Sequence, residues 1–298
     1  MAEAVSPLGL RAAAPPIGQT LSIFNPVFLG IDEFGHDVYV PIIFRNLLPG
    51  GEPGAGKSSL LNNFVAHAAL SLDCRLILLD GKRVELGLWK RVADVFVGPD
   101  IERALRVLRR VQQIMDNRYE YLDWCERRKI EPGDQITAYL LAVDEIAYFS
   151  VTVGDKKTQE EFSNLLRDVV ARGRAVGIMV VAATQRPSSD IIPTSLRDLF
   201  AWRFAGRCTT DSSSDVVLGH GWAARGFSAN TIAPNNQGVG YLIAEGGVPK
   251  LVKSAYLSDL DIRRIARYAE RLRAENTVRS AAGLYRPELR PDDLAVAA

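Results

Sequence analysis

Residues 51–58 match the pattern G-x-x-x-x-G-K-[ST] of a phosphate-binding loop. The glycines allow backbone N–H groups to surround phosphate oxygens, Lys57 can reach the β- and γ-phosphates, and the Ser58 hydroxyl can bind Mg²⁺. The predicted nucleotide-binding residues are Gly51, Glu52, Pro53, Gly54, Ala55, Gly56, Lys57, Ser58 and Ser59. A flexible glycine turn is the alternative, and the motifs that follow argue against it.

An apolar stretch, residues 139–143, runs directly into Asp144 and Glu145. In phosphate-loop ATPases an aspartate at the end of such a strand holds the Mg²⁺ shell, and a neighbouring glutamate can accept the proton of the attacking water. Many strands end in Asp-Glu, so the pattern gains its weight from lying about ninety residues after the loop. The sequence therefore predicts ATP and Mg²⁺ as cofactors, with Ser58 and Asp144 on the metal and Lys57 and Glu145 in catalysis. A helix-capping role for Asp144 is compatible with this interpretation.

Gln185 and several arginines are further candidates for the same chemistry. Residues 182–187 follow the next buried strand, which would bring Gln185 beside the γ-phosphate as a sensor of hydrolysis, although an ordinary exit from a strand is the alternative. Arg172 and Arg174 precede that strand, and Arg203 and Arg207 flank the one after it. A guanidinium group stabilises a transferring phosphoryl group well, often from a neighbouring subunit. For any single arginine a solvated helix end is the favoured explanation, but for the set we expect at least one to act in trans.

Helical and strand patterns alternate after the loop, with continuous β-branched runs typical of strands buried on both faces. The expected strands are 46–49, 76–79, 94–97, 139–143, 178–183 and 201–206, and the expected helices are 58–71, 101–128, 157–175 and 259–274. A hairpin is expected within residues 29–44, and a C-terminal hairpin at 240–244 and 251–255. The fold class is therefore α/β: a RecA-like P-loop NTPase with a mainly parallel central sheet, helices on both faces and a C-terminal edge hairpin.

Composition limits the remaining possibilities. The 298 residues carry a net charge of +1, which argues against a monomer that wraps DNA over its whole surface but not against a ring that lines a channel with a few cations from each subunit. Three separated cysteines without a C-x-x-C pair favour a reducing compartment, and no apolar run approaches a membrane span. We therefore expect a cytoplasmic protein that another protein recruits to a membrane if it works there.

The chain divides into an expected flexible arm (1–24), a motor domain (25–275) and a tail (276–298). The motor resembles that of the FtsK/SpoIIIE family of double-stranded DNA translocases over about residues 28–275. Residues 182–187 resemble the family's Ala-Thr-Gln-Arg-Pro segment, and residues 172–178 the arginine-bearing helix end before it. Residues 80–86 are similar to a family Asp-Pro-Lys…Glu-Leu element, with Gly81 in place of proline, and residues 152–157 resemble a loop that is one residue shorter in the family.

The resemblance implies a homo-hexameric ring around double-stranded DNA. It implies nucleotide, magnesium, water-activating and sensor roles for Lys57, Ser58, Asp144, Glu145 and Gln185, and a trans-acting finger at Arg174 or Arg207. Candidate DNA contacts in the pore are Lys156 and Lys157 and, less securely, Lys82 and Arg83, with a solvated turn as the alternative for the lysine pair.

The use of such a motor is less closely defined by the sequence. The chain shows neither a multi-span membrane anchor nor a winged-helix module, so it resembles the TraB-like transfer proteins of conjugative and integrative elements in mycelial bacteria more than a chromosome-segregation protein. Two alternatives remain open: an ATPase that drives protein export of the type VII secretion kind, and a partition or assembly factor that binds ATP without pumping.

Overall fold

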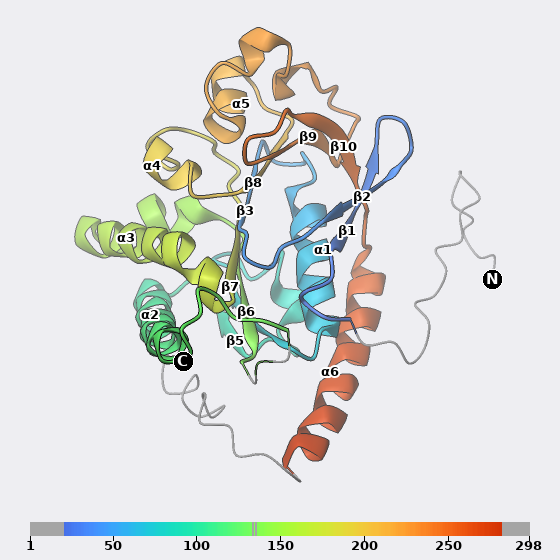
Figure 1. Ribbon diagram of the computed structural model, residues 1–298. Helices are drawn as coiled ribbons and strands as arrows, with labels where there is room; N and C mark the ends of the chain where they lie inside the picture. The colour runs from blue at the N-terminus through green and yellow to red at the C-terminus, as the bar shows by residue number, and fades with distance from the viewer. Residues whose placement is uncertain (1–20, 133, 135, 282–298) are drawn as a thin grey trace, which may run out of the picture.

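A ten-stranded sheet forms the centre of the molecule, with strand order β2-β1-β10-β9-β8-β3-β7-β6-β4-β5 (Figure 1). The computed structural model describes residues 21–281 except 133 and 135. The strands are β1 (Val27–Asp32), β2 (Asp37–Val40), β3 (Leu47–Gly50), β4 (Cys74–Leu79), β5 (Val95–Val97), β6 (Ala138–Val143), β7 (Ile178–Ala182), β8 (Trp202–Gly206), β9 (Val239–Ala244) and β10 (Lys250–Ser254).

The half of the sheet from β8 to β5 is entirely parallel. Parallel strands share one carboxyl edge, so the segments that follow β3, β4, β6 and β7 converge there. The expectation of a P-loop fold with a mainly parallel central sheet is confirmed.

The other half of the sheet is antiparallel and contains both predicted hairpins. The C-terminal hairpin β9–β10 joins the sheet through β8 and has an inner position. It does not form the edge itself, because β1 pairs with β10 and the N-terminal hairpin β1–β2 extends the sheet further.

Helices cover both faces of the sheet, as expected (Figure 1). Successive residues of a strand face opposite sides: Ile77 packs under α2 and α3, whereas Leu76 and Leu78 pack under α1 and α6. The helices are α1 (Lys57–Leu70), α2 (Ile101–Trp124), α3 (Lys156–Arg172), α4 (Thr194–Arg197), α5 (Asp211–Leu218) and α6 (Asp259–Ala281). Short 3₁₀ helices are η1 (Gly87–Trp89), η3 (Gly173–Val176), η4 (Ala223–Arg225) and η5 (Ala229–Thr231), and η2 (Tyr148–Thr152) is a π-helix.

Helix ends differ most from the sequence prediction. α2 ends at Trp124 and not at 128, because Glu126 adopts a left-handed φ of 54° that cannot continue a helix. α3 gives way to η3 after Arg172, and α6 continues to Ala281, past its predicted end at 274 and into the predicted tail. η2, α4 and α5 were not predicted.

Part of the predicted arm belongs to the folded body. Ile23 is fully buried, and the Ser22 hydroxyl donates to Asp73 Oδ2 at 2.5 Å. The expectation that residues 21–24 are flexible is therefore wrong, and the rest of the predicted arm (1–20) and residues 282–298 of the predicted tail lie outside the described residues. No described helix combines the length and the apolar character that crossing a bilayer requires.

Candidate nucleotide-binding site

The phosphate-binding loop joins the carboxyl end of β3 to the first turn of α1. Gly51, Gly54 and Gly56 adopt positive φ values of 145°, 78° and 89°, which favour glycine. Space matters as much as conformation, since a Cβ on Gly56 would lie 2.3 Å from the Cα of Gly238. Together these glycines hold a backbone turn at the N-terminus of a 14-residue helix, which is a favourable environment for phosphate.

Lys57 is the first residue of α1, and its side chain is buried against the loop. Its Nζ donates to the backbone carbonyl of Glu52 at 2.7 Å. Burial lowers the pKa of Lys57 to about 8, although the negative charges of Glu145 and Asp144 act in the opposite direction. The ammonium therefore stays mostly protonated at pH 7 and can bind a triphosphate.

Asp144 directly follows β6, close enough to Lys57 for its negative charge to act on the lysine's pKa. Burial, together with Asp80 and Glu85, raises the pKa of Asp144 to about 7. Its Oδ2 is buried and has no hydrogen-bond partner within residues 21–281 as described. A hard divalent cation prefers carboxylate and hydroxyl oxygens, so this orphaned oxygen fits Mg²⁺, with Ser58 as the second protein ligand.

Glu145 is held by the segment that follows β7. Thr184 Oγ1 donates to Glu145 Oε1 at 2.8 Å, and the backbone N–H of Gln185 donates to Oε2 at 2.7 Å. The sequence directed attention to Gln185, but the hydroxyl of Thr184 was missed as a positioning group. The Ala-Thr-Gln sequence directly after a buried strand is the signal that could have identified it.

Lys82 lies at this site rather than on a separate surface. Its Nζ is 3.4 Å from Gln185 Oε1, and its charge acts to lower the pKa of Asp144. Asp80 fixes the turn by accepting from the backbone N–H groups of Lys82 (3.0 Å) and Leu86 (2.9 Å). These contacts bring Lys82 together with the sensor candidate, whereas the next residue, Arg83, lines a different hollow.

Gly81 has a physical reason for replacing the proline of the resembled element. A Cβ at Gly81 would lie 2.2 Å from the Tyr148 ring, so this aromatic side chain occupies the space that any larger residue needs. Tyr148 begins the unpredicted π-helix η2, which therefore packs directly against the turn after β4.

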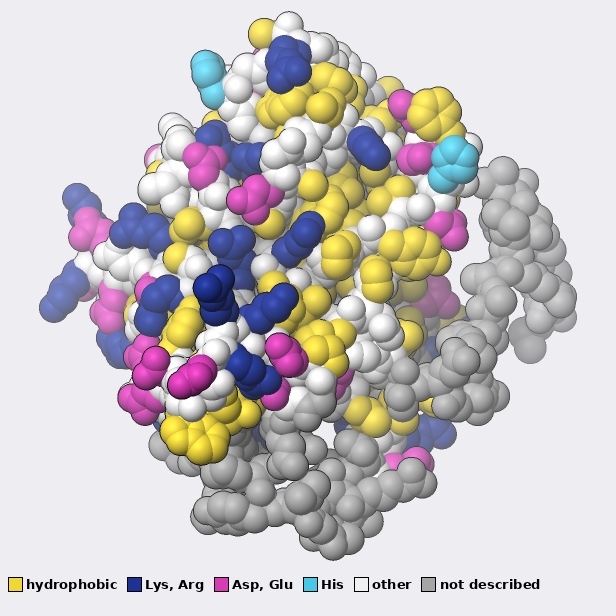
Figure 2. Space-filling view, viewed as in Figure 1, with side chains coloured by type: hydrophobic (Ala, Val, Ile, Leu, Met, Phe, Trp, Pro, Cys, Tyr) yellow, Lys and Arg dark blue, Asp and Glu magenta, His cyan; other side chains and the backbone are white. Residues whose placement is uncertain are grey.

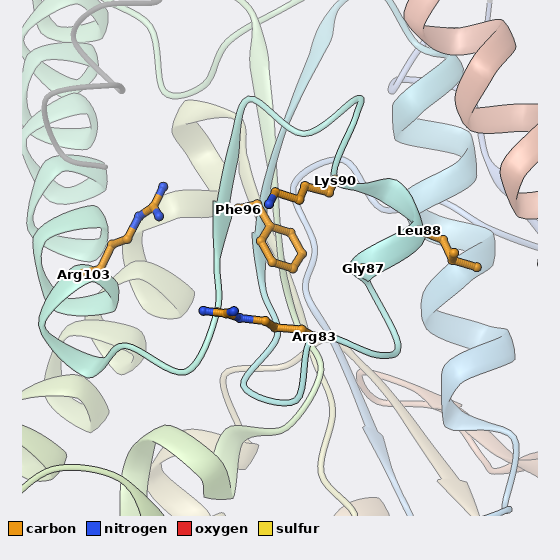
Figure 3. Close-up of a pocket in the computed structure, with 7 residues that line it drawn as sticks. Arg83, Gly87, Leu88, Lys90, Phe96 and Arg103 are labelled. Carbon is orange, nitrogen blue, oxygen red and sulfur yellow. The ribbon is translucent and has the colours of Figure 1, made fainter.

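The side chain of Arg83 points away from the phosphate-binding loop and lines a hollow of about 640 Å³. Lys90, Phe96 and Arg103 line the same hollow (Figure 3). Arg83 adopts a left-handed φ of 59°, and the Lys90 ammonium lies 5.8 Å from the centre of the Phe96 ring. Arg103 approaches from the first turn of α2. Three cations thus surround one hollow, and no ion pair is recorded for them within the described part of the chain.

Lys156 and Lys157 are not in a loop, contrary to expectation. Asp155 caps α3 by accepting from the Thr158 N–H at 2.8 Å, so the two lysines form the first turn of that helix. Both side chains are exposed, and Lys156 has a weak pairing with Glu160 at 3.9 Å.

Arg207 and Arg174 lie at opposite edges of the sheet. Arg207 follows β8, and its Nη1 is 2.5 Å from Oε2 of Glu52 in the phosphate-binding loop of the same chain. Arg174 belongs to η3, which precedes β7, so the length of a strand separates it from that loop. Its guanidinium is 3.9 Å from Glu245, and Lys and Arg side chains gather on the face that carries α2 and α3 (Figure 2).

The hollow beside the loop has a volume of about 470 Å³ and contains groups that the sequence analysis missed. It is lined by Pro53, Gly54, Gly56, Lys57, Ser58, Ser59, Glu85, Gln185, Gln237, Gly238, Lys253, Ser254 and Tyr256. Gln237 and Gly238 precede β9, Lys253 and Ser254 end β10, and Tyr256 follows β10. Their sequence carries no motif, and only the antiparallel pairing brings them to the loop.

The family profile and the curated relatives that match this sequence belong to the same family. The sequence profile of the FtsK/SpoIIIE family matches residues 25–151. The DNA translocase FtsK of Borreliella burgdorferi is 26% identical over 85% of this chain and 33% of its own length. That of Chlorobaculum tepidum is 32% identical over 66% of this chain and 26% of its own length. The chain thus spans a third or less of the length of these curated relatives.

Two solved structures that resemble this chain come from different kinds of protein. The pCW3 conjugation coupling protein TcpA, solved as a monomer with ATPγS, has a TM-score of 0.70 at 19% identity, over 84% of this chain and 71% of that one. The cytoplasmic domain of the type VII secretion ATPase EccC of Thermomonospora curvata has a TM-score of 0.65 at 21% identity, over 87% and 33%. At these identities the likeness shows the fold of P-loop ATPases.

Proposed function

Because this chain belongs to the FtsK/SpoIIIE family, we propose that it hydrolyses ATP and uses the energy to move double-stranded DNA. Family and fold make it a P-loop ATPase, and the coupling to DNA is the proposal. One observation supports it above all: the orphaned Asp144 oxygen, protonated Lys57 and the fixed Glu145 carboxylate converge at the carboxyl edge of the sheet.

In the proposed mechanism each residue has a separate task. Lys57 leaves the Glu52 carbonyl and binds the β- and γ-phosphates, and the loop N–H groups surround their oxygens. Ser58 and Asp144 would hold Mg²⁺, which would supply positive charge next to the transferring phosphoryl group. Glu145 accepts the proton of the attacking water through Oε2, which accepts only the Gln185 N–H among the described residues, whereas Oε1 already accepts from Thr184 and Ala147. Gln185 responds to loss of the γ-phosphate and passes the change to Lys82.

We assign the trans-acting finger to Arg174 and a role within its own subunit to Arg207. The Arg207 guanidinium already neutralises Glu52 of its own loop, whereas Arg174 is a strand's length from its own site and can serve only a neighbour's. This assignment requires a ring, and a homo-hexamer is the form that we propose.

DNA contacts in this proposal are made by phosphate-binding cations. Lys156 and Lys157 are exposed at a helix end, and Arg83 shares its hollow with Lys90 and Arg103 (Figure 3). Contacts of this kind bind the DNA backbone without reading bases, and they weaken with salt. Lys82 is withdrawn as a DNA contact and assigned to the nucleotide site.

The proposed cargo is the DNA of a conjugative or integrative element, as for a TraB-like transfer protein, and the proposed location is the cytoplasm, with a membrane-bound recruiting partner. The likeness to TcpA, a conjugation coupling protein, favours this use. The EccC structure favours a second candidate, a motor for protein export. We prefer DNA because the curated relatives are named DNA translocases.

The deciding experiment measures ATP hydrolysis with and without linear duplex DNA, together with displacement of a triplex-forming strand from that duplex. We expect DNA to stimulate hydrolysis and the strand to be displaced, and we expect Lys57→Ala to abolish both. Stimulation by a candidate exported protein instead of DNA would favour the export motor. Nucleotide binding without turnover would favour a partition or assembly factor.

A further inference from the structure

Two side-chain N–H donors converge beside Gly219, the residue that follows α5. They are Nη1 of Arg203, near the start of β8, and the indole Nε1 of Trp222. The position that a Cβ on Gly219 would occupy lies 3.5 Å from the first nitrogen and 3.6 Å from the second. We propose that this place, which we call the Gly219 anion site, binds an oxyanion: the phosphate or carboxylate group of a ligand. The site is separate from the proposed ATP site and does not depend on it.

Arg203 is a mostly buried cation whose charge is poorly neutralised. Its side chain is 13% exposed, and its Nε is buried without a hydrogen-bond partner in the part of the chain that the structure describes. Its guanidinium is 3.8 Å from Asp198 Oδ1, an oxygen that already accepts from Arg197 Nε at 2.8 Å. Burial, followed by the charge of Arg197, lowers the pKa of Arg203. A buried charge needs close hydrogen-bonded partners, and an oxyanion would supply one.

Trp222 presents its indole N–H from a fixed position. The Arg225 guanidinium carbon lies 4.2 Å from the centre of the indole ring. Asp215 accepts from the backbone N–H groups of the residues on either side of Trp222, at 2.8 and 2.9 Å. The indole N–H itself donates to no other group among the described residues. It is therefore held in place as a donor whose acceptor must come from outside.

Glycine leaves the space between the two donors open. Gly219 adopts a φ of 117°, which favours glycine, and its neighbours lie at ordinary contact distance from the Cβ position. An oxygen atom fits there, and it needs to approach each donor by only about 0.5 Å to accept both hydrogen bonds. α4 and α5, which lie side by side (Figure 1), bring Arg197 and Arg225 to the same region, so the surrounding charge favours an anion over a neutral acceptor.

The test follows the indole N–H resonances of the four tryptophans in the full-length chain by ¹H–¹⁵N NMR. Sodium phosphate or sodium acetate is added at constant ionic strength. We expect the resonance of Trp222, which Trp222→Phe identifies by its absence, to shift and to saturate. Trp89 and Trp202 already donate to oxygens of the protein, at 2.8 and 3.1 Å, so their resonances should stay in place. Trp124 is 82% exposed and reports any general effect of the salt.

Variants separate the site from a general response to anions. Arg203→Gln should weaken the anion affinity by about tenfold or more because it removes the charged donor, and Arg203→Lys should recover part of it. Arg106→Gln, which changes an exposed arginine on α2, is the matched control and should behave like the parent. Unchanged resonances of Trp89 and Trp202 show that each variant is folded.

Both anions support the proposal if they bind, and the tighter one identifies the group: phosphate a phosphoryl ligand, acetate the carboxylate of a protein or metabolite. A Trp222 resonance that moves with neither anion overturns the proposal, and so does a shift that is as large and as tight in Arg203→Gln as in the parent. Lys57→Ala removes phosphate binding at the phosphate-binding loop and should leave the Trp222 shift unchanged. A shift that disappears in Lys57→Ala would show that the anion acts from the loop and would also overturn the proposal.

Discussion

The cationic side chains at the two edges of the parallel half-sheet differ in how tightly they are paired. At the carboxyl edge Lys57 and Arg207 contact the phosphate-binding loop of their own chain, Lys57 through a carbonyl and Arg207 through a carboxylate. At the amino edge Arg174 pairs only loosely, 3.9 Å from an exposed glutamate. A loosely paired arginine can be donated to another molecule at little energetic loss, whereas a tightly paired one cannot. The difference predicts that the carboxyl edge serves its own nucleotide and the amino edge serves a neighbour's.

The largest expected effect tests the amino edge. Arg174→Ala should lower ATP turnover about a thousandfold and leave ATP binding intact, because a finger contributes only when charge develops in the transition state. Steady-state hydrolysis and ATP titration measure the two quantities. Arg106→Ala, an exposed arginine on α2, is the control.

Mixing subunits sharpens this prediction. Arg174→Ala subunits keep an intact site, and Lys57→Ala subunits keep an intact finger, so a mixture should recover part of the parent's activity. A mixture that stays inactive while both variants still assemble into rings contradicts the trans assignment.

Glu145→Gln should have the next largest effect, at the carboxyl edge. Loss of the general base lowers turnover by about a hundredfold or more, and binding persists because Lys57 and the phosphate-binding loop are unchanged. Mixing with Lys57→Ala subunits should restore nothing, since both changes damage the same site. Recovered activity would mean that Glu145 acts across an interface, and Glu160→Gln on α3 serves as the control.

The contrast between the edges was partly available from sequence. Arg174 precedes a predicted strand and Arg207 follows one, and in a parallel sheet those positions lie at opposite edges. Lys57 and Asp144 were predictable because a local pattern and the strand that carries it fix both position and direction. The position of Lys82 beside Gln185 was not predicted, because the path of its turn depends on Asp80 and Tyr148, which no local pattern reveals.

The antiparallel half shows the other limit of sequence reasoning. Both hairpins were predicted, but their order in the sheet depends on pairing between β1 and β10, more than two hundred residues apart in the chain. That pairing and the close approach of Gly56 and Gly238 together bring Tyr256 to the hollow beside the phosphate-binding loop. Periodicity in the sequence does not reveal non-local pairing, so this part of the hollow could be found only in three dimensions.

A third prediction concerns the stability of the carboxyl edge. The folded-state pKa of Asp144, about 7, lies above its ordinary value of 3.8, so the native state binds the proton more tightly than the unfolded chain. The free energy of unfolding should therefore fall as pH rises from about 4 to about 7. Asp144→Asn cannot ionise and should be more stable than the parent by roughly 4 kcal/mol at pH 7.5, with the advantage vanishing near pH 4.

Urea unfolding in EDTA at several pH values measures this difference without a bound metal. Asp123→Asn, an exposed aspartate on α2, is the matched control and should follow the parent at every pH. An Asp144→Asn protein that is less stable than the parent at pH 7.5 would show that the carboxylate is already satisfied without a cation.

The smallest expected effect belongs to Arg207. Its pairing with Glu52 is partly exposed, with side-chain exposures of 29% and 22%, so Arg207→Ala should weaken ATP binding by only about fivefold, through a less ordered loop. The Thr209 hydroxyl also donates to Glu52 and limits the loss. Arg207→Lys should recover part of the affinity because it keeps the charge, whereas mixing Arg207→Ala with Lys57→Ala subunits should recover none. If mixing does restore activity, Arg207 serves a neighbour as Arg174 is proposed to do, and the distinction between the two edges of the sheet is lost.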